Sequence, residues 1–243
     1  MGEGKIRLFL DHDFSPGQTV PLRPDQAHYL FAVMRRGAGD ALLVFNGRDG
    51  EWLAEVTEAR KRAGAVTVQE RTRPQLDPPD LWLLFAPIKK ARTDFIVEKA
   101  VELGVARIQP VSTRFTNAER IRRDRLQAHA VEAAEQCGAT FVPEVADLAP
   151  LDRVLSGWPA GRQLVFCDEA RAGAATDPRA VLTGAPAAVL IGPEGGFSDD
   201  ERGRLSALPQ AVSLALGPRI LRADTAAVAA ITLWQSAVGD WRR

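Results

Sequence analysis

The sequence predicts an α/β protein in which a small β-rich domain precedes a domain of alternating strands and helices. Residues 73–80 contain three prolines in a polar stretch, which resists both helix and strand and marks a domain boundary. Short β-like runs dominate before it, whereas strand-like and helix-like segments alternate after it. A chain of 243 residues with 46% hydrophobic residues is long enough to bury a core in each of two modest domains.

Residues 1–72 carry the pattern of a small β-barrel. One helix-like segment at 25–34 interrupts the β-like runs. The runs expected to form strands are 5–10, 41–45, 52–57 and 65–69.

Residues 81–243 alternate between the strand and helix periods after the linker at 73–80. Ordinary topology rules would make this segment a doubly wound sheet, because true knots are nearly absent from proteins. The expected strands are 81–86, 106–111, 164–166, 188–191 and 212–216, and the expected helices are 93–103 and 124–136.

Two loops near the C-terminal end, 191–197 and 216–226, are the most informative part of the sequence. Each follows a short apolar run and precedes a helix-like segment, so both are expected at the carboxyl ends of strands, where ligands of open α/β sheets bind. The first loop has three glycines within five residues, which leaves backbone N–H groups accessible. Ser198 and Glu201 then match a capping box, which predicts that a helix begins at Ser198.

In the second loop, Gly217 and Pro218 end an apolar run, and Asp224 or Thr225 can cap the following helix. The helical spacing of the apolar residues from 227 to 238 predicts a buried helix with Arg222 and Asp224 at its N-terminal mouth. Two simpler interpretations stay open: the turns can connect elements without binding anything, and Arg222 with Asp224 can form a surface ion pair. Neither a dinucleotide-binding nor a P-loop motif occurs.

These residues carry a family resemblance. The segments 190–198 and 216–226, together with 89–105 and 132–137, are similar to the ribosomal RNA small subunit methyltransferase E family of the SPOUT superfamily. The resemblance implies a trefoil-knotted SPOUT-type methyltransferase domain at 81–243, a linker at 73–80 and a PUA-like β-barrel RNA-binding domain at 1–72. The knot is expected from the resemblance alone.

The resemblance also implies an activity: S-adenosyl-L-methionine-dependent methylation of N3 of uridine 1498 in 16S ribosomal RNA, within the small ribosomal subunit, by a homodimer. Because N3 carries a proton, the reaction needs a general base or a cation beside the uridinate oxygens. Arg222 suits the second role, and Asp224 can orient Arg222 or accept the proton. The residues expected to bind the cofactor are Gly192, Glu194, Gly196, Leu216, Gly217, Ile220 and Leu221.

The chain departs from the family pattern at two positions. Asp224 stands where the family usually has glutamate, and Ala139 stands where it usually has arginine. These departures favour one alternative function, a catalytically silent RNA-binding or ribosome-assembly factor. A further alternative is a SPOUT methyltransferase that acts on another RNA.

An arginine-rich stretch at 107–125 is the predicted RNA contact. It holds six arginines against Glu119 and Asp124, a local excess of four positive charges that can neutralise phosphates. A solvated helix start is the simpler interpretation. In the first domain, arginines beside Tyr29 offer cations next to an aromatic ring, although they can equally be a charged helix end. The arginines expected to contact RNA are Arg35, Arg36, Arg114, Arg122 and Arg123.

Overall composition mainly argues against a partner read from net charge, a metal site and a membrane segment. Lys+Arg and Asp+Glu are both 31, so net charge indicates no partner. Cys137, Cys167 and the three histidines lack the spacing of a metal site, and we expect none. Few cysteines and the absence of an apolar run long enough for a membrane span or a secretory signal predict a soluble, cytoplasmic protein without a membrane partner.

Overall fold

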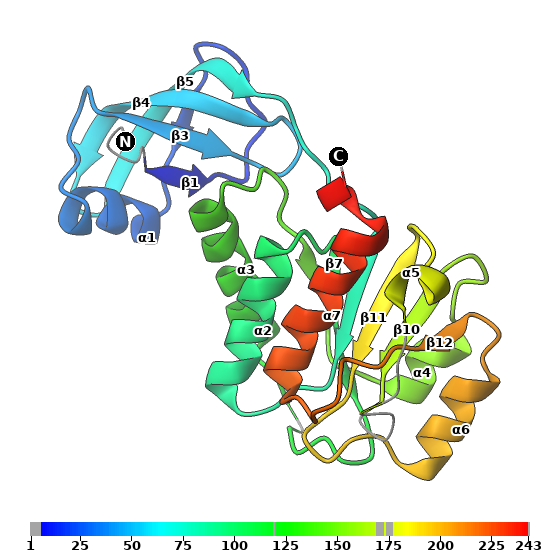
Figure 1. Ribbon diagram of the computed structural model, residues 1–243. Helices are drawn as coiled ribbons and strands as arrows, with labels where there is room; N and C mark the ends of the chain where they lie inside the picture. Colours follow the sequence, from blue (N-terminus) through cyan, green and yellow to red (C-terminus); the bar gives the residue numbers. More distant parts are fainter. Residues whose placement is uncertain (1–5, 119, 169–172, 174–176, 243) are drawn as a thin grey trace. The chain divides into compact units, whose positions relative to one another are not determined.

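The structure is a computed structural model that describes residues 6–118, 120–168, 173 and 177–242. Lys5 and Glu119, which entered the sequence predictions, lie outside the described residues. The chain forms two compact units (Figure 1). The first comprises Met1–Asp77 with Ala134–Phe141, and the second comprises Pro78–Ala133 with Val142–Arg243.

The first unit is built on a five-stranded sheet. Its strand order is β1 (Arg7–Phe9), β3 (Ala41–Phe45), β4 (Glu51–Arg60), β5 (Ala63–Arg73) and β2 (Thr19–Pro21). β1 runs parallel to β3 and the other pairs are antiparallel. The four predicted strands are present, whereas β2 was not predicted, because it is a three-residue edge strand that ends in a proline and has no longer apolar run around it. The predicted helix is α1 (Pro24–Ala27) continued by a π-helical turn, η1 (His28–Val33).

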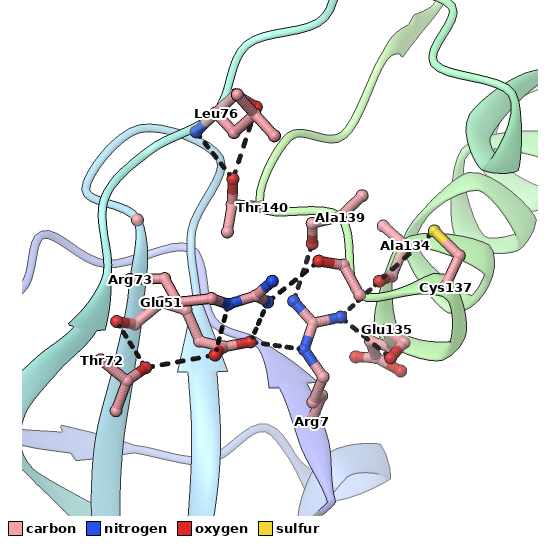
Figure 2. Close-up of polar contacts among 12 residues, drawn as sticks. Arg7, Glu51, Thr72, Arg73, Leu76, Ala134, Glu135, Cys137, Ala139 and Thr140 are labelled. Carbon is pink, nitrogen blue, oxygen red and sulfur yellow. Dashed lines mark hydrogen bonds and ion pairs between the residues drawn. The ribbon is translucent and has the colours of Figure 1, made fainter. Parts of the chain in front are cut away.

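A buried ionic cluster ties segment 134–141 into the first unit (Figure 2). Glu51, which is 3% exposed, accepts hydrogen bonds from Arg7 Nε at 2.7 Å and from Arg73 Nη2 at 2.6 Å. The Arg7 guanidinium also donates to the carbonyls of Ala134, at 2.6 Å, and Ala139, at 2.8 Å. Arg7 thereby satisfies a carbonyl group that the end of helix α3 (Arg123–Cys137) leaves without a helical partner.

The second unit contains a parallel sheet in the order β12 (Ala211–Ser213), β10 (Gln163–Cys167), β11 (Ala187–Ile191), β6 (Leu81–Phe85), β7 (Arg107–Ser112) and β8 (Glu144–Val145). A short strand β9 (Ala149–Pro150) pairs with the far end of β7. The central strands are buried on both faces, which explains their continuous apolar runs. The five predicted strands are confirmed, and the two-residue strands β8 and β9 were missed.

Helices cover both faces of this sheet. α2 (Lys90–Glu102) and α7 (Ala223–Val238) pack together, and α7 lies against β11 (Figure 1). Alternate residues such as Leu164 and Leu190 pack instead with Leu151 of α4 (Leu151–Ser156) and Leu205 of α6 (Asp199–Ala207). The remaining short elements are α5 (Pro178–Val181) and the 3₁₀ turn η3 (Asp240–Arg242).

The two predicted helix starts have different outcomes. Ser198 caps α6: its backbone N–H donates to Glu201 Oε2 at 2.9 Å and its Oγ accepts from the Glu201 N–H at 3.3 Å, so the capping box is confirmed. The predicted capping of α7 by Asp224 or Thr225 is wrong, because Arg222 occupies the N-cap position without a side-chain cap bond. Asp224 lies in the first turn and accepts the Thr225 N–H at 2.8 Å.

Candidate cofactor and RNA site

The two loops singled out from the sequence meet at one cavity in the second unit. The loop after β11 and the loop after β12 line a space of about 260 Å³ at the carboxyl ends of their strands. The end of β10 and the start of α7 complete the wall. This placement follows from the parallel sheet, because β10 lies between β11 and β12 and brings their ends together.

Small residues keep the cavity open. Gly196 and Gly217 have φ values of +70° and +102°, which side chains rarely adopt, so the turns at both loops require glycine. Gly192 faces the buried ring of Phe197, and a methyl group at this glycine would lie 3.1 Å from ring atoms. Apolar side chains form much of the remaining surface, among them Leu214, which directly follows β12, and Ala226 of α7.

The structure brings the predicted cofactor residues together. All seven, Gly192, Glu194, Gly196, Leu216, Gly217, Ile220 and Leu221, line this cavity. Arg222 lines it as well and is exposed, and its guanidinium makes no hydrogen bond or ion pair with any other described residue. The proposed Arg222–Asp224 surface pair is therefore not formed, and the Asp224 side chain faces another arginine instead.

That arginine is Arg92, at the start of α2. Its Nη1 donates to Glu194 Oε1 at 2.7 Å, and its Nε lies 3.6 Å from Asp224 Oδ2. The Arg92 guanidinium thus links the carboxylate of Glu194, in the first loop, to that of Asp224, at the start of α7. Sequence reasoning missed this role, because the pairing joins positions about a hundred or more residues apart and no local spacing rule connects them.

Three further cavity residues with ionisable side chains were also missed. Asp168, next to the carboxyl end of β10, bonds Arg202 Nε through its Oδ1 at 3.2 Å, while Arg219 is an exposed cation of the second loop. Cys167 is the third, and burial raises the pKa of its thiol to about 12, so it stays protonated and is a poor nucleophile. The signal for Cys167 and Asp168 was available, since both adjoin the carboxyl end of a predicted strand.

Four of the six arginines in the 107–125 stretch already have a side-chain or backbone partner. Arg122 pairs with Asp124 at 2.7 Å, and Arg123 Nε donates to the Val145 carbonyl at 2.7 Å. Two others pair with acids: Arg125 with Asp94, and Arg107 with Glu144 at 3.2 Å. Among the described residues, only two of the six arginines, Arg114 and Arg120, have exposed side chains for which no partner is recorded. The freely available charge is thus smaller than the sequence excess suggested.

In the first unit, the two predicted RNA contacts follow η1. Arg35 is exposed with a φ of +54°, and Arg36 is half-buried, with its backbone N–H donating to the Leu30 carbonyl at 2.9 Å. Tyr29, within η1 and six residues before Arg35, packs against the core of this unit. The pair therefore lies at the end of a helical segment, which leaves both the RNA contact and the charged helix end as interpretations.

Two kinds of feature are absent from the described part of the chain. It contains no group of three or more histidine, cysteine, aspartate or glutamate side chains placed to hold a metal ion. None of its helices combines the length and apolar character needed to span a bilayer.

Comparison with known proteins identifies the family. The model of the RNA methyltransferase domain matches residues 75–235, and that of the RNA methyltransferase PUA domain matches residues 22–69. The ribosomal RNA small subunit methyltransferase E of Neisseria gonorrhoeae, crystallised with S-adenosyl methionine, is 30% identical, with a TM-score of 0.85 over 98% of this chain and 99% of that one. The chain belongs to the ribosomal RNA small subunit methyltransferase E family.

One curated relative and one further solved structure are similar to this chain over nearly its whole length. The methyltransferase E of Rickettsia conorii is 28% identical over 93% of each chain. A methyltransferase from Legionella pneumophila, in complex with its bound cofactor S-adenosylmethionine, is 30% identical with a TM-score of 0.88, covering 97% of this chain and 99% of that one. The fold class expected from the sequence, a knotted SPOUT-type methyltransferase domain preceded by a PUA-like β domain, is thereby confirmed.

Proposed function

We propose that this protein transfers a methyl group from S-adenosyl-L-methionine to N3 of a uridine in 16S ribosomal RNA, at position 1498. The observation that carries the proposal is the convergence of both loops on one cavity, in a fold whose relatives at 30% identity were crystallised with S-adenosylmethionine. The E-family membership supports small-subunit RNA as the substrate.

The cavity residues fit this cofactor. Glycine turns leave backbone amides accessible for the adenine and ribose, and Leu214, Leu221 and Ala226 offer an apolar surface for the ring. Asp168 and Glu194 supply carboxylates, which suit a ligand that carries a sulfonium and an ammonium group. When bound, this cofactor supplies an electrophilic methyl group for displacement at carbon.

The chain itself supplies alignment and charge. The exposed guanidinium of Arg222 offers donors to the uracil oxygens as N3 loses its proton, which stabilises the developing anion. Arg92 holds Glu194 and Asp224, and it thereby keeps the first loop close to the start of α7. In this arrangement Asp224 is oriented by Arg92, which leaves it available to accept a proton from the substrate side.

The substrate must present an accessible base. N3 lies on the Watson–Crick edge, so the uridine has to be unpaired or extruded before reaction. We propose that the PUA-like domain, residues 1–72, helps to hold the RNA through Arg35 and Arg36, and that Arg114, Arg122 and Arg123 contribute from the second domain. A ribosomal substrate places the proposed enzyme in the cytoplasm.

The deciding experiment is mass spectrometry of small-subunit RNA after incubation with the protein and isotopically labelled S-adenosylmethionine. We expect label on N3 of a single uridine. Label on another RNA or another atom would overturn the assignment. Calorimetry with S-adenosylmethionine tests the alternative: an absence of binding at millimolar cofactor, together with RNA binding, would identify a catalytically silent RNA-binding factor.

The proposed homodimer has its own measurement. Light scattering at micromolar protein should give twice the chain mass of 26.4 kDa. A monomer with full activity would remove the dimer from the proposal.

A further inference from the structure

The loop after β7 is held in a defined conformation beside the cavity. The Thr113 N–H donates to Thr116 Oγ1 at 2.9 Å, and the Thr116 N–H donates to the Thr113 carbonyl at 3.2 Å. The Arg114 N–H donates to Glu201 Oε1 at 2.8 Å, so the loop is attached to the residue that completes the α6 capping box. Its geometry is therefore set by neighbouring structure and does not depend on bound RNA.

This loop presents an aromatic side chain at the rim of the cavity. Phe115 is 45% exposed, whereas Phe85 and Phe197 of the same unit are buried. A methyl group at Gly195 would lie 3.1 Å from Phe115 Cβ, so the phenylalanine rests directly on the first loop. Gly195 stands between two residues that line the cavity, Glu194 and Gly196. The ring of Phe115 is thus attached to the cavity edge without being part of the core.

The charges near this ring favour a nucleic-acid ligand. Arg114 is the preceding residue and Arg120 follows in the same loop, and these are the two arginines of the 107–125 stretch with exposed side chains and no recorded partner among the described residues. Exposed aromatic rings accompanied by unpaired cations are the combination with which proteins stack unpaired bases and neutralise the adjoining phosphates. A purely structural phenylalanine needs neither the exposure nor the charges.

We propose that Phe115 is a stacking platform for an unpaired base of the substrate RNA, at or next to the target uridine, with Arg114 and Arg120 contacting the flanking phosphates. The inference rests on the proposed function, since it takes the neighbouring cavity as the methyl-transfer site. It adds a residue that determines RNA binding and that neither cofactor loop contains.

The test compares the full-length wild type with Phe115→Ala, Phe115→Leu and Phe115→Trp. Binding of a fluorescent, uridine-containing single-stranded RNA is measured by anisotropy, without methyl donor. Because stacking of a base on an aromatic ring contributes directly to single-strand affinity, we expect Phe115→Ala to weaken RNA binding about tenfold. The leucine variant should lose most of that affinity, while tryptophan retains it. Phe95→Ala is the matched control, since Phe95 is a similarly exposed phenylalanine of α2 (39%), and it should bind RNA as the wild type does.

Further readouts separate stacking from structural effects. Calorimetry with S-adenosylmethionine should give the same affinity for all Phe115 variants, and light scattering should give the same mass. An abasic substitution in the RNA at the stacked position should make wild type and Phe115→Ala bind equally. The inference is overturned if leucine replaces phenylalanine without loss, if cofactor affinity falls in parallel, or if the mass changes. Failure of wild-type methyl transfer would refute the proposed function and leave the binding comparison valid.

Discussion

Two groups of arginines, one in each unit, have opposite surroundings. In the first unit, Arg7 and Arg73 both donate hydrogen bonds to the buried Glu51, and each also donates to at least one backbone carbonyl. At the cavity of the second unit, Arg222 and Arg219 are exposed, and no partner is recorded for them among the described residues. The comparison separates charges that hold the chain together from charges kept available for a ligand.

Burial explains why the two groups can be told apart. A buried charge without a partner is strongly unfavourable, so the Glu51 cluster is stable only with its hydrogen bonds complete. An exposed arginine at a cavity mouth has no such requirement, because water solvates it until a ligand arrives. Five predictions test this division, ordered from the largest expected effect to the smallest.

The largest effect is expected from Arg222→Ala. Removing one preorganised donor from a developing anion typically lowers turnover by about 100- to 1,000-fold. Because Arg222 is exposed and unpartnered, we expect nearly unchanged cofactor affinity and an unchanged melting temperature. Methyl transfer under single-turnover conditions, calorimetry and thermal unfolding measure the three quantities.

Arg222→Lys is the matched control, since it keeps the charge and loses the planar fork of donors. It should recover only part of the rate. Wild-type turnover in Arg222→Ala would remove this residue from the mechanism, and a large loss of stability would place it with the structural arginines instead.

The opposite pattern is expected for Glu51→Gln. Neutralising one member of a buried ionic cluster leaves Arg7 uncompensated, and we expect the first unit to lose about 3 kcal/mol of unfolding free energy. Chemical denaturation measures the loss, and cofactor affinity, set by the cavity of the second unit, should not change below the unfolding transition. A variant as stable as the wild type would show that the cluster is dispensable.

The same residue gives a pH prediction. Burial raises the pKa of Glu51, but hydrogen bonds from Arg73 and Arg7 outweigh it, so the folded-state pKa lies below the ordinary value of 4.5. A lowered folded pKa contributes stability that is complete above the ordinary value and is lost as pH falls through the folded one. The stability difference between wild type and Glu51→Gln should therefore be constant near neutrality and shrink only as pH falls below the ordinary carboxyl value of 4.5. A difference that persists unchanged into strong acid would contradict this.

Arg92 lies between the two classes, because it has partners but is 29% exposed at its side chain. We expect Arg92→Ala to lower turnover about tenfold by releasing Glu194 and Asp224 from their relative positions. Arg92→Lys should retain one of the two contacts and an intermediate rate. Combining Arg92→Ala with Glu194→Gln should cost less than the sum of the single changes, because both remove the same link. Strict additivity would show that the link has no role.

The fold was largely predictable because its elements carry local signals. The strand 41–45 was predicted with its observed bounds, and Ser198 with Glu201 predicted the start of α6. The features that were missed are short or depend on remote partners. Strand β8 has only two residues. The place of segment 134–141 in the first unit depends on hydrogen bonds from Arg7 and Arg73, far along the chain. No pattern within either segment encodes those contacts.

The cavity could be predicted for the same reason, since glycines and strand ends are local features. Its electrostatics could not. Asp224 faces Arg92 and not its near neighbour Arg222. Arg222 is the extended N-cap residue, whereas Asp224 already lies in the first turn of α7. Likewise, the charge excess of 107–125 overstated the available charge, because Asp94 and Glu144 lie outside the segment that was counted.

The smallest effect is expected at the capping box. Ser198→Ala removes one acceptor at the start of α6 and should cost about 1 kcal/mol of stability. Glu201 accepts hydrogen bonds from both the Ser198 N–H at this helix start and the Arg114 N–H, so Glu201→Gln should weaken two contacts at once and cost more stability than the serine change.

If the Arg114 contact orders the Phe115 loop, Glu201→Gln should also weaken RNA binding, whereas Ser198→Ala should not. Equal RNA affinities in the two variants would show that the Phe115 loop keeps its conformation without the hydrogen bond from the Arg114 N–H to Glu201.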